Sequence, residues 1–416
     1  MKKLPKIIAW LSIVLALASA VVIAYVPSMS PLFLTLLIVN MLLPIVFFKG
    51  YEKPALVVCR LLVGGLFIFS SFTKGVDPLG TKYKMLDYFA AYGIEWLNDY
   101  ALVLAMAMIL AEFIVGICLF TNIFSRLAVL GATLLMVFFT ITTLFDALYD
   151  VVPDCGCFGT AVKMTNWQTF YKNLVIDAVL LPLIIHNRKL GNKLAWRTEF
   201  CIGCLYAVLF LAFEIYNYRH LPVVDFMNWK IGRQMKQENT DEQRIYLIYK
   251  NKTTGETHEY LSPNYPWNDS VWMSEWEFVD QRTEGGESYI GFTAYDADGE
   301  DVTEMILSTE KLLMFTSSDL NEITEGEWGK MEDIAKAASN KGFNVIWLTE
   351  AEPAAIDSLQ GVYPFVEEVY YGDELEIKTI VRYNPGLIYL DDGLVIDKWS
   401  AIDFPTGDKL NALFEK

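Results

Sequence analysis

Residues 59–78 read CRLLVGGLFIFSSFTKGVDP, an apolar run that begins at an arginine and ends at a lysine followed by an Asp-Pro pair. A helix needs about 20 mostly apolar residues to cross the hydrocarbon core of a bilayer. This run has that length, so it predicts a membrane-spanning helix with charged groups close to both ends. Further apolar runs of similar length lie on either side of it.

The first half of the chain contains seven such runs. The first follows MKKLPK, a basic start that is typical of a signal peptide, but it is long for one and lacks a clear cleavage site. We therefore expect it to form an uncleaved hairpin with the second run. The predicted spans are 6–27, 32–48, 54–73, 101–122, 126–148, 170–186 and 199–217.

The connections between these runs alternate in charge. Lys and Arg gather before the first run, between the second and third, after the fourth, and between the sixth and seventh. Basic loops stay in the cytoplasm. Seven spans then predict an inner-membrane protein with a cytoplasmic N-terminus and a periplasmic C-terminal domain, and they put the connection 149–169 on the outer face.

The two halves of the chain differ in charge. Residues 1–220 hold 12 acidic and 17 basic side chains, whereas residues 221–416 hold 38 acidic and 16 basic. This acidity argues against nucleic acid as a partner, because phosphate backbones are bound by Lys and Arg. It suits a solvated domain kept soluble by net charge. The expected partners are membrane lipid and an exported protein.

The connection before the sixth run contains VVPDCGCFGTAVKMTNW at 151–167. Cys155 and Cys157 flank one glycine, and an extended i,i+2 pair lies near the upper limit of Cα separation for a disulfide. Gly156 permits the turn that would close the bond. Such a strained ring is of the readily reduced kind. Thiol–disulfide exchange is one interpretation, and inert or structural thiols are another.

A metal half-site with Asp154 is a third interpretation of the same loop. A zinc site needs about four ligands, whereas the two cysteines supply only half of that number and the loop has no histidine. We therefore predict no metal. Of the other cysteines, Cys59 and Cys118 are expected to be buried apolar residues. Cys201 and Cys204 share a helix face, where packing, acylation and a redox role all stay open.

Three stretches share a recognisable pattern: residues 59–78, AEFIVGICLF at 111–120, and CGCFG at 155–159 followed by NWQTFYKNL at 166–174. Together they resemble the DoxX and MauE-like membrane proteins, a four-helix-bundle group associated with redox and thiol maturation. The resemblance covers about 54–187 and implies thiol chemistry at the two loop cysteines. A quinone as cofactor follows only by analogy with other four-helix thiol oxidases. MauE is associated with methylamine utilisation, of which this chain gives no independent sign.

Polar residues within the apolar runs are candidates for lining a pocket for an anionic or quinone-like ligand. Charged groups in a membrane usually face the bundle interior and pair there, so Glu112 is expected to have an interior partner. Arg60 and Lys74 either line the pocket or extend to the two interfaces. Asn173 and Asp177 are one turn apart on one helix face, where they would cap the pocket beneath the CGC loop.

Beyond residue 225 the apolar runs shorten and alternate. A hairpin is predicted over 244–261, followed by strands and helices in an order that indicates an α/β domain with a mixed sheet. Two stretches stand out, LLMFTSSDL at 312–320 and NPGLIYLDDGLVIDKW at 384–399. With them, residues 290–416 resemble a thioredoxin-like domain of the periplasmic TlpA kind, in which the first stretch matches the strand before the active-site turn and the second matches the hairpin that begins with the cis-proline, here Pro385.

This domain departs from its relatives at the decisive position. Where they carry Cys-x-x-Cys, the chain has Thr316, Ser317, Ser318 and Asp319, and no cysteine follows Cys204. Hydroxyl groups cannot form a disulfide. The domain is therefore predicted to be a docking or scaffold module without dithiol chemistry.

The predicted fold is an α-helical membrane bundle of about seven spans, including a DoxX-like four-helix bundle, followed by an α/β thioredoxin-like domain without CxxC. Two functions compete. One is a thiol–disulfide oxidoreductase of redox-linked protein maturation that is coupled to quinone, and the other is a non-enzymatic assembly or scaffold protein. The predicted boundaries are 1–53 for a transmembrane hairpin, 54–187 for the DoxX/MauE-like domain, 188–221 for the seventh span and linker, 222–290 for a β-rich segment, and 291–416 for the thioredoxin-like domain.

Overall fold

The computed structural model describes most of the chain from residue 52 onward, and the chain divides into two compact units, Met1–Met227 and Asn228–Lys416. The predicted spans 6–27 and 32–48 lie outside the described residues, as does Cys155. The described residues are 52–152, 156–159, 161–162, 164–191, 194–236, 244–252, 255–261, 266, 270–284 and 292–414.

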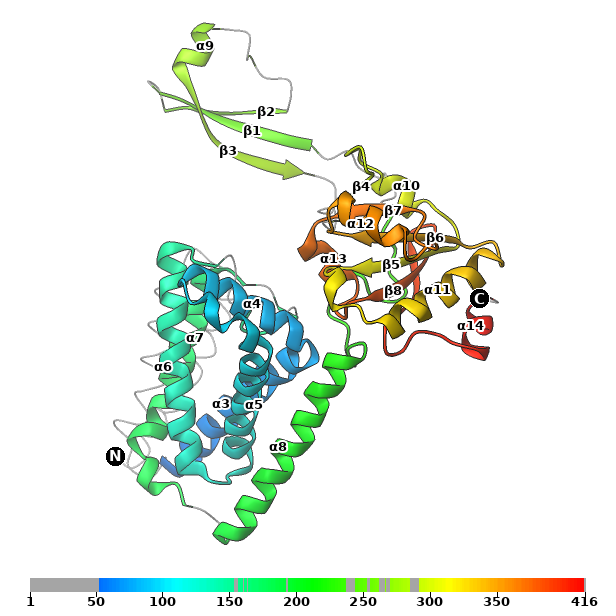
Figure 1. Cartoon of the computed structure of the whole chain (residues 1–416). Helices are drawn as coiled ribbons and strands as arrows, with labels where there is room; N and C mark the ends of the chain where they lie inside the picture. The colour runs from blue at the N-terminus through cyan, green and yellow to red at the C-terminus, as the bar shows by residue number, and fades with distance from the viewer. Residues whose placement is uncertain are drawn as a thin grey trace. The chain divides into compact units, whose positions relative to one another are not determined.

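Five helices of the first unit, within the described residues, are long and apolar enough to cross a membrane. They match the last five predicted spans and are shown in Figure 1. A helix that exposes a broad apolar surface is suited to lipid rather than water, and α6 does so through residues such as Leu130, Leu134 and Phe138. The five helices are α3 (Glu52–Val76), α5 (Ala101–Thr121), α6 (Ser125–Tyr149), α7 (Asn166–Ile185) and α8 (Trp196–Arg219).

Small residues allow α3 and α5 to pack at close range. A Cβ added to Gly64 would lie 2.8 Å from the carbonyl oxygen of Gly116, and one added to Gly116 would lie 2.9 Å from the Ile68 nitrogen. Close backbone approach at small residues is a common basis of helix packing in membranes. The apolar core of the bundle, which includes Val63 and Leu119, lies around this contact.

The connection between the predicted spans 54–73 and 101–122 contains a helix that the apolar runs do not predict. Here α4 (Pro78–Ala91) precedes the 3₁₀ turn η2 (Glu95–Tyr100). Asp77 caps α4 by accepting a hydrogen bond from the Gly80 nitrogen, and proline occupies the first helical position, where its fixed φ is favourable. The helix has only 14 residues, which is too short to cross a bilayer.

The loop that carries the CGC sequence lies between two sharply defined helix ends. Asp150, in the left-handed conformation, ends α6. Thr165 begins α7 through a capping box with Gln168, in which each side chain bonds the other residue's backbone nitrogen and so satisfies donors that the first turn leaves open. A short 3₁₀ turn, η3 (Asn187–Lys189), follows α7.

The second unit contains a six-stranded mixed sheet in the order β4-β7-β6-β5-β8-β9. Strand β5 is buried along its whole length because it lies between parallel β6 and antiparallel β8. The mixed α/β domain predicted from the sequence is thus present. The strands are β4 (Ala294–Tyr295), β5 (Leu312–Ser317), β6 (Asn344–Thr349), β7 (Val369–Gly372), β8 (Gly386–Asp391) and β9 (Leu394–Ser400).

Helices pack against this sheet, and the core gathers around Trp328 of α11 and Trp347 of β6. Helix α13 is an addition to the predicted elements, and Asp373 caps its first turn. The peptide bond Asn384–Pro385 before β8 is cis, at the proline expected from the sequence. The helices of this region are α10 (Thr303–Leu307), η4 (Leu320–Glu322), α11 (Glu325–Ser339), α12 (Pro353–Gln360), α13 (Glu374–Ile380) and α14 (Asp408–Leu413).

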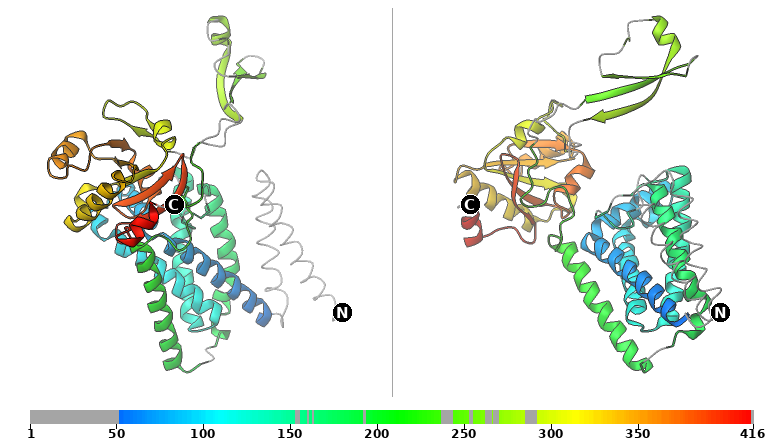
Figure 2. Two further views of the ribbon diagram at one scale, coloured as in Figure 1. Left: turned by 90° about the vertical axis from the view of Figure 1, so that its right-hand side faces the viewer. Right: turned by 180° about the vertical axis from the view of Figure 1, so that it is seen from behind.

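A separate three-stranded antiparallel sheet precedes the mixed sheet in the chain (Figure 2). It contains the predicted hairpin as β1 (Arg244–Asn251) and β2 (Thr257–Leu261), with β3 (Trp276–Glu284) on the other side of β1. The short helix α9 (Ser270–Glu275) precedes β3. Trp272 and Trp276 stack on one another with ring centroids 6.0 Å apart, so these aromatic residues pack together.

Candidate functional site

A buried ion pair joins α3 to α5. The Lys74 ammonium lies 2.8 Å from Glu112 Oε2, and the two side chains are only 5% and 4% exposed. The Lys74 nitrogen also lies 5.2 Å from the centre of the Phe139 ring of α6. Lys74 therefore stays inside the bundle rather than extending to the interface. It is the interior partner of Glu112 that the sequence alone leaves unidentified.

Ser70 connects this ion pair to the CGC loop. Its hydroxyl oxygen lies 3.0 Å from Glu112 Oε1 and 2.8 Å from the carbonyl oxygen of Cys157. A hydroxyl carries a single hydrogen, so Ser70 shares that hydrogen between the two acceptors. The backbone of the loop and the charge of the ion pair are thereby coupled through one side chain.

The residues after Cys157 pack directly on the end of α3. Gly159 has a φ of +55°, and a Cβ at this position would lie 3.2 Å from the carbonyl oxygen of Thr73. Glycine therefore permits both the backbone conformation and the close approach. The centre of the Phe158 ring lies 5.5 Å from that of Phe69. The Lys172 side-chain nitrogen lies 4.6 Å from the centre of the Phe158 ring.

A second polar cluster holds the other end of the same connection. The Asn166 amide donates to the carbonyl oxygen of Val152 at 2.9 Å and to the Asp150 carboxylate at 3.3 Å. Tyr88 of α4 donates to Asp146 Oδ2 at 2.6 Å. Both ends of the loop are thus fixed by hydrogen bonds to the bundle, and α4 contributes to one of them.

The candidate pocket residues do not form a single cluster. Lys74 and Glu112 are in contact, but Arg60 lies 14 residues earlier on α3, or about 21 Å along the helix axis. Asn173 and Asp177 both contact threonines of α6, at 3.1 Å to Thr143 and 2.8 Å to Thr140. These two residues join α7 to α6.

Ser70, Tyr88 and Asp146 are site residues that sequence reasoning missed. Ser70 precedes Lys74 by four residues and so shares its helix face, which is a signal that the sequence contains. Asp146 is an acidic residue near the end of an apolar run, and such a residue is also a candidate for a functional site. Tyr88 has no comparable signal, because α4 itself is not expected from the apolar runs.

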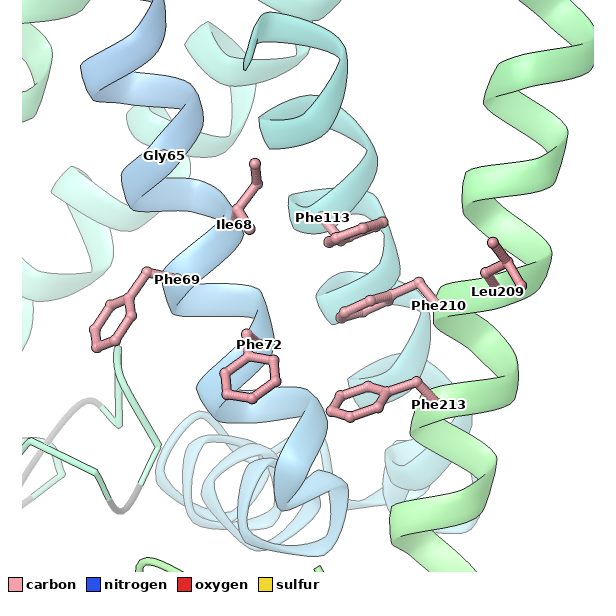
Figure 3. Close-up of a pocket in the computed structure, with 8 residues that line it drawn as sticks. All are labelled: Gly65, Ile68, Phe69, Phe72, Phe113, Leu209, Phe210 and Phe213. Atoms are coloured by element: carbon pink, nitrogen blue, oxygen red, sulfur yellow. The ribbon is translucent and has the colours of Figure 1, made fainter. Parts of the chain in front are cut away.

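An aromatic groove lies beside this site, between α3, α5 and α8. Its volume is about 470 Å³, and five phenylalanines line it. Phe113 and Phe210 stack with ring centroids 3.9 Å apart, and Phe72 faces Phe213 at 5.5 Å. Phe69, which contacts Phe158 of the CGC loop, also lines the groove (Figure 3). Phe69 is thus the lining residue that also contacts the loop.

The remaining cysteines lie apart from the loop. Cys59 and Cys118 are buried, whereas Cys201 and Cys204 are exposed on α8. No group of three or more His, Cys, Asp or Glu side chains within the described residues has an arrangement that could hold a metal. Asp154 and Cys155 lie outside those residues.

Hydroxyl groups occupy the end of β5 in the second unit. Thr316 and Ser317 are buried, and their hydroxyl oxygens have no hydrogen-bond partner among the described residues. Asn384 accepts a hydrogen bond from the Ser318 nitrogen at 3.2 Å and donates to the Asp319 carbonyl oxygen at 2.6 Å. The turn after β5 is thus tied to the residue before the cis-proline.

Residues 52–186 match a family model described as methylamine utilisation protein MauE. The match includes α3, α4, α5, α6 and α7, and with them Ser70, Lys74 and Glu112, but it ends before α8. No curated protein and no solved structure matches the chain. The comparison therefore concerns the part of the membrane unit that holds the CGC loop.

Proposed function

We propose that Cys155 and Cys157 form a thiol–disulfide exchange centre in a membrane protein of redox-linked protein maturation. The observation that carries this proposal is the contact of Ser70 with the Cys157 carbonyl oxygen, at a buried ion pair. The ion pair is costly to break, and the Ser70 hydroxyl links it to the loop backbone. The match to the MauE family over the same residues adds support.

In the proposed reaction, a thiolate of an exported protein attacks one sulfur of the Cys155–Cys157 disulfide. A mixed disulfide forms and the second loop sulfur leaves as a thiolate. A second substrate thiol then attacks the mixed disulfide, which releases an oxidised substrate and the reduced loop. Two electrons and two protons pass from substrate to loop. Ser70, Lys74 and Glu112 act as positioning residues, because their contacts are with the loop backbone and with one another.

Reoxidation of the loop requires an acceptor of two electrons, and we assign this role to a membrane quinone. The dithiol forms its S–S bond again as the quinone takes up two electrons and two protons to become a quinol. The basic connections in the sequence support an orientation with the loop on the periplasmic face of the inner membrane. The substrate would then be a protein exported to that compartment.

A second candidate function is that of a non-enzymatic scaffold, which the hydroxyl side chains at the end of β5 favour. The strand order β7-β6-β5-β8-β9 and the contact of the cis-proline segment with the turn after β5 support a thioredoxin-like fold for the second unit. Hydroxyl side chains stand where a dithiol would act. The domain would bind a partner without exchanging electrons with it, and the loop thiols would be structural.

Alkylation of the full-length protein in membranes tests the two candidates. After mild oxidation, wild-type protein should lose two alkylatable thiols and regain them on reduction. Cys155→Ala should abolish this change and trap a mixed disulfide through Cys157. Cys201→Ala is the matched control, because it removes an exposed thiol far along the sequence from the loop, and it should behave as wild type.

The scaffold hypothesis predicts the opposite result. If both loop thiols stay reduced under every oxidant and Cys155→Ala traps no mixed disulfide, the proposal of thiol–disulfide exchange at this loop is wrong. A thiol change that persists in Cys155→Ala but disappears in Cys201→Ala would assign the chemistry to α8 instead.

A further inference from the structure

Tyrosine and tryptophan side chains gather at the end of the membrane unit that carries the CGC loop. Residues 101–148, which include α5 and nearly all of α6, contain neither residue type. The exposed large side chains of that stretch are Leu, Val, Ile and Phe, which suit the hydrocarbon of a bilayer. Exposed Tyr and Trp flank the stretch and form what we name the aromatic belt. Its members are Tyr92 (49% exposed), Trp96 (74%), Tyr100 (59%), Tyr149 (70%) and Trp167 (45%).

The helices bring the belt to one end of the bundle. Tyr149 is the last residue of α6, and Trp167 lies in the first turn of α7. Tyr92 stacks on Tyr88 with ring centroids 6.3 Å apart, and Tyr88 donates to Asp146 near the end of α6. The other two members lie on η2, between α4 and α5. The belt therefore adjoins the polar cluster that holds the start of the CGC loop.

Helix α4 has the composition of a helix that lies in a membrane interface. Lys82, Lys84 and Asp87 give it three charged residues among 14, and Lys84 pairs with Asp87 at 3.6 Å on its surface. Charged groups are costly in hydrocarbon, whereas a lysine extends to the headgroups along its apolar stem. Tyr and Trp are enriched at the headgroup level. A short charged helix followed by exposed aromatic residues is thus suited to the interface.

The backbone of the CGC loop folds down to the level of this layer. Ser70, whose hydroxyl lies 2.8 Å from the Cys157 carbonyl oxygen, is six residues before Val76, the last residue of α3. Six residues extend about 9 Å along a helix axis, and the headgroup layer is roughly 5–8 Å thick on each side of a bilayer. Because α4 follows α3 directly, the Cys157 backbone lies at the headgroups and not in bulk water.

We propose that α4 and the aromatic belt lie in the lipid headgroup layer, and that the substrate of the CGC loop is a cysteine of a membrane-attached protein. The first part stands on the surface alone. The second part rests on the proposed function and names its substrate class. A cysteine held close to the lipid reaches the level of Cys157, whereas a cysteine on a folded protein in bulk water has to enter the headgroup layer first.

Continuity with the lipid-facing surface favours headgroups over a protein as the occupant of the belt. Leu148, which is 55% exposed, adjoins Tyr149, and exposed Leu and Phe side chains continue from it along α6. Tyr and Trp have an apolar body and a polar group that needs a partner. A bilayer supplies hydrocarbon beside α6 and polar headgroups beside the belt, so the order of side chains along the helix matches the order of layers in the lipid.

Quenching by brominated phosphatidylcholine tests the first part, with the purified full-length protein reconstituted into vesicles. The tryptophan emission that disappears in Trp96→Phe reports on Trp96. Lipids brominated near the glycerol end of the acyl chain should quench this component several-fold more than lipids brominated near the methyl end. Trp328→Phe is the matched control, because Trp328 is only 4% exposed in the core of the second unit. The Trp328 component should respond to neither lipid.

Two results would overturn the headgroup assignment. A Trp96 component that neither lipid quenches would mean that the belt is covered by protein or faces water. Stronger quenching by bromine near the methyl end would place η2 in the hydrocarbon. No cysteine takes part in this measurement, so its outcome is independent of the proposed exchange.

Two lipid-anchored peptides test the substrate class. Each carries a cysteine in a mixed disulfide with thionitrobenzoate, either next to the acyl anchor or beyond a flexible spacer of about ten residues, which extends roughly 17 Å. The protein carries Cys155→Ala, Cys201→Ala and Cys204→Ala. Its Cys157 thiolate attacks the peptide sulfur, a protein–peptide disulfide forms, and thionitrobenzoate leaves as a coloured thiolate. The peptide without the spacer should react several-fold faster.

The same protein with Cys157→Ala is the control and should release no thionitrobenzoate. Equal rates for the two peptides, or a faster reaction with the spacer, would show that Cys157 stands above the headgroups, and the substrate class would be wrong while the exchange stands. If neither peptide reacts, the proposed exchange fails and the substrate class fails with it, whereas the quenching of Trp96 still decides the position of the belt.

Discussion

Lys74 and Gly75 are neighbours on α3, and each lies near a buried glutamate. The two glutamates differ in their hydrogen-bond partners. Lys74 pairs with Glu112 of α5, and Ser70 lies within hydrogen-bond distance of the same carboxylate. A Cβ added to Gly75, the next residue, would lie 3.6 Å from Glu214 Cγ of α8, and glycine has no polar side chain to offer it. The first glutamate has its partners inside the protein, whereas the second has none among the described residues.

The two carboxyl groups therefore contribute differently to the stability of the folded bundle. A carboxylate paired with a lysine and a hydroxyl is part of the folded bundle, and removing a partner leaves an uncompensated charge. A carboxyl without partners contributes no such contact, so its replacement by an apolar residue removes a cost. The two glutamates should therefore respond to substitution with opposite signs.

The largest effect is expected at the paired site. Lys74→Met leaves Glu112 buried without its cation and should destabilise the bundle by about 3–5 kcal/mol. Unfolding of the purified protein by a denaturing detergent measures this loss. In Lys74→Met/Glu112→Leu both charges are absent, so much of the stability should return. A double variant no more stable than the single one would show that the pair is not the cause.

The close contact of α3 and α5 should be nearly as sensitive. Gly64→Leu drives side-chain atoms into backbone that lies 2.8 Å from the Cβ position, and overpacking of this kind typically costs about 1–3 kcal/mol. The shift should also separate Ser70 from Glu112 and speed alkylation of the loop cysteines. Gly203→Ala on α8 is the control, because its nearest neighbour is 4.0 Å away. Equal alkylation rates in the two variants would contradict the coupling.

A gain of stability is expected at the unpaired site. Glu214→Leu should stabilise the protein by about 1–2 kcal/mol, because it removes an unsatisfied buried group. Glu112→Leu should destabilise it, because it leaves Lys74 buried without its carboxylate. The same detergent titration compares both variants. A loss of stability in both would mean that Glu214 has a partner in the folded protein, and the contrast between the sites would disappear.

Much of the membrane unit is predictable from the sequence because lipid imposes a simple rule. Apolar length is enough to find α3, α5, α6, α7 and α8, since a helix satisfies all the backbone hydrogen bonds of such a segment internally. Lys74 and Glu112 are also recognisable as costly charges in apolar runs. That they pair with each other is not readable, because it depends on how α3 and α5 cross at Gly64 and Gly116.

The parts that sequence reasoning missed depend on contacts between helices. Glu214 is as costly a charge in its run as Glu112, so the same rule could have identified it. Its lack of a partner, however, is a property of the packed bundle. Helix α4 was not predicted because it is too short to span a membrane, although Asp77 and Pro78 are recognisable signals for the start of a helix. In the second unit the alternating runs predicted the sheet, but the short α13 lacked a periodic apolar pattern.

The smallest effect is expected at Ser70, which links the paired site to the loop. Ser70→Ala removes one hydroxyl and should cost about 1 kcal/mol of stability, because Lys74 still satisfies Glu112. Its effect on the loop should be clearer: without the contact to the Cys157 carbonyl oxygen, the loop cysteines should be alkylated several-fold faster. Ser71→Ala is the matched control, since among the described residues the Ser71 hydroxyl bonds its own helix, at the Ile68 carbonyl oxygen. If both variants alkylate at the wild-type rate, Ser70 does not hold the loop, and the ion pair supports only the bundle.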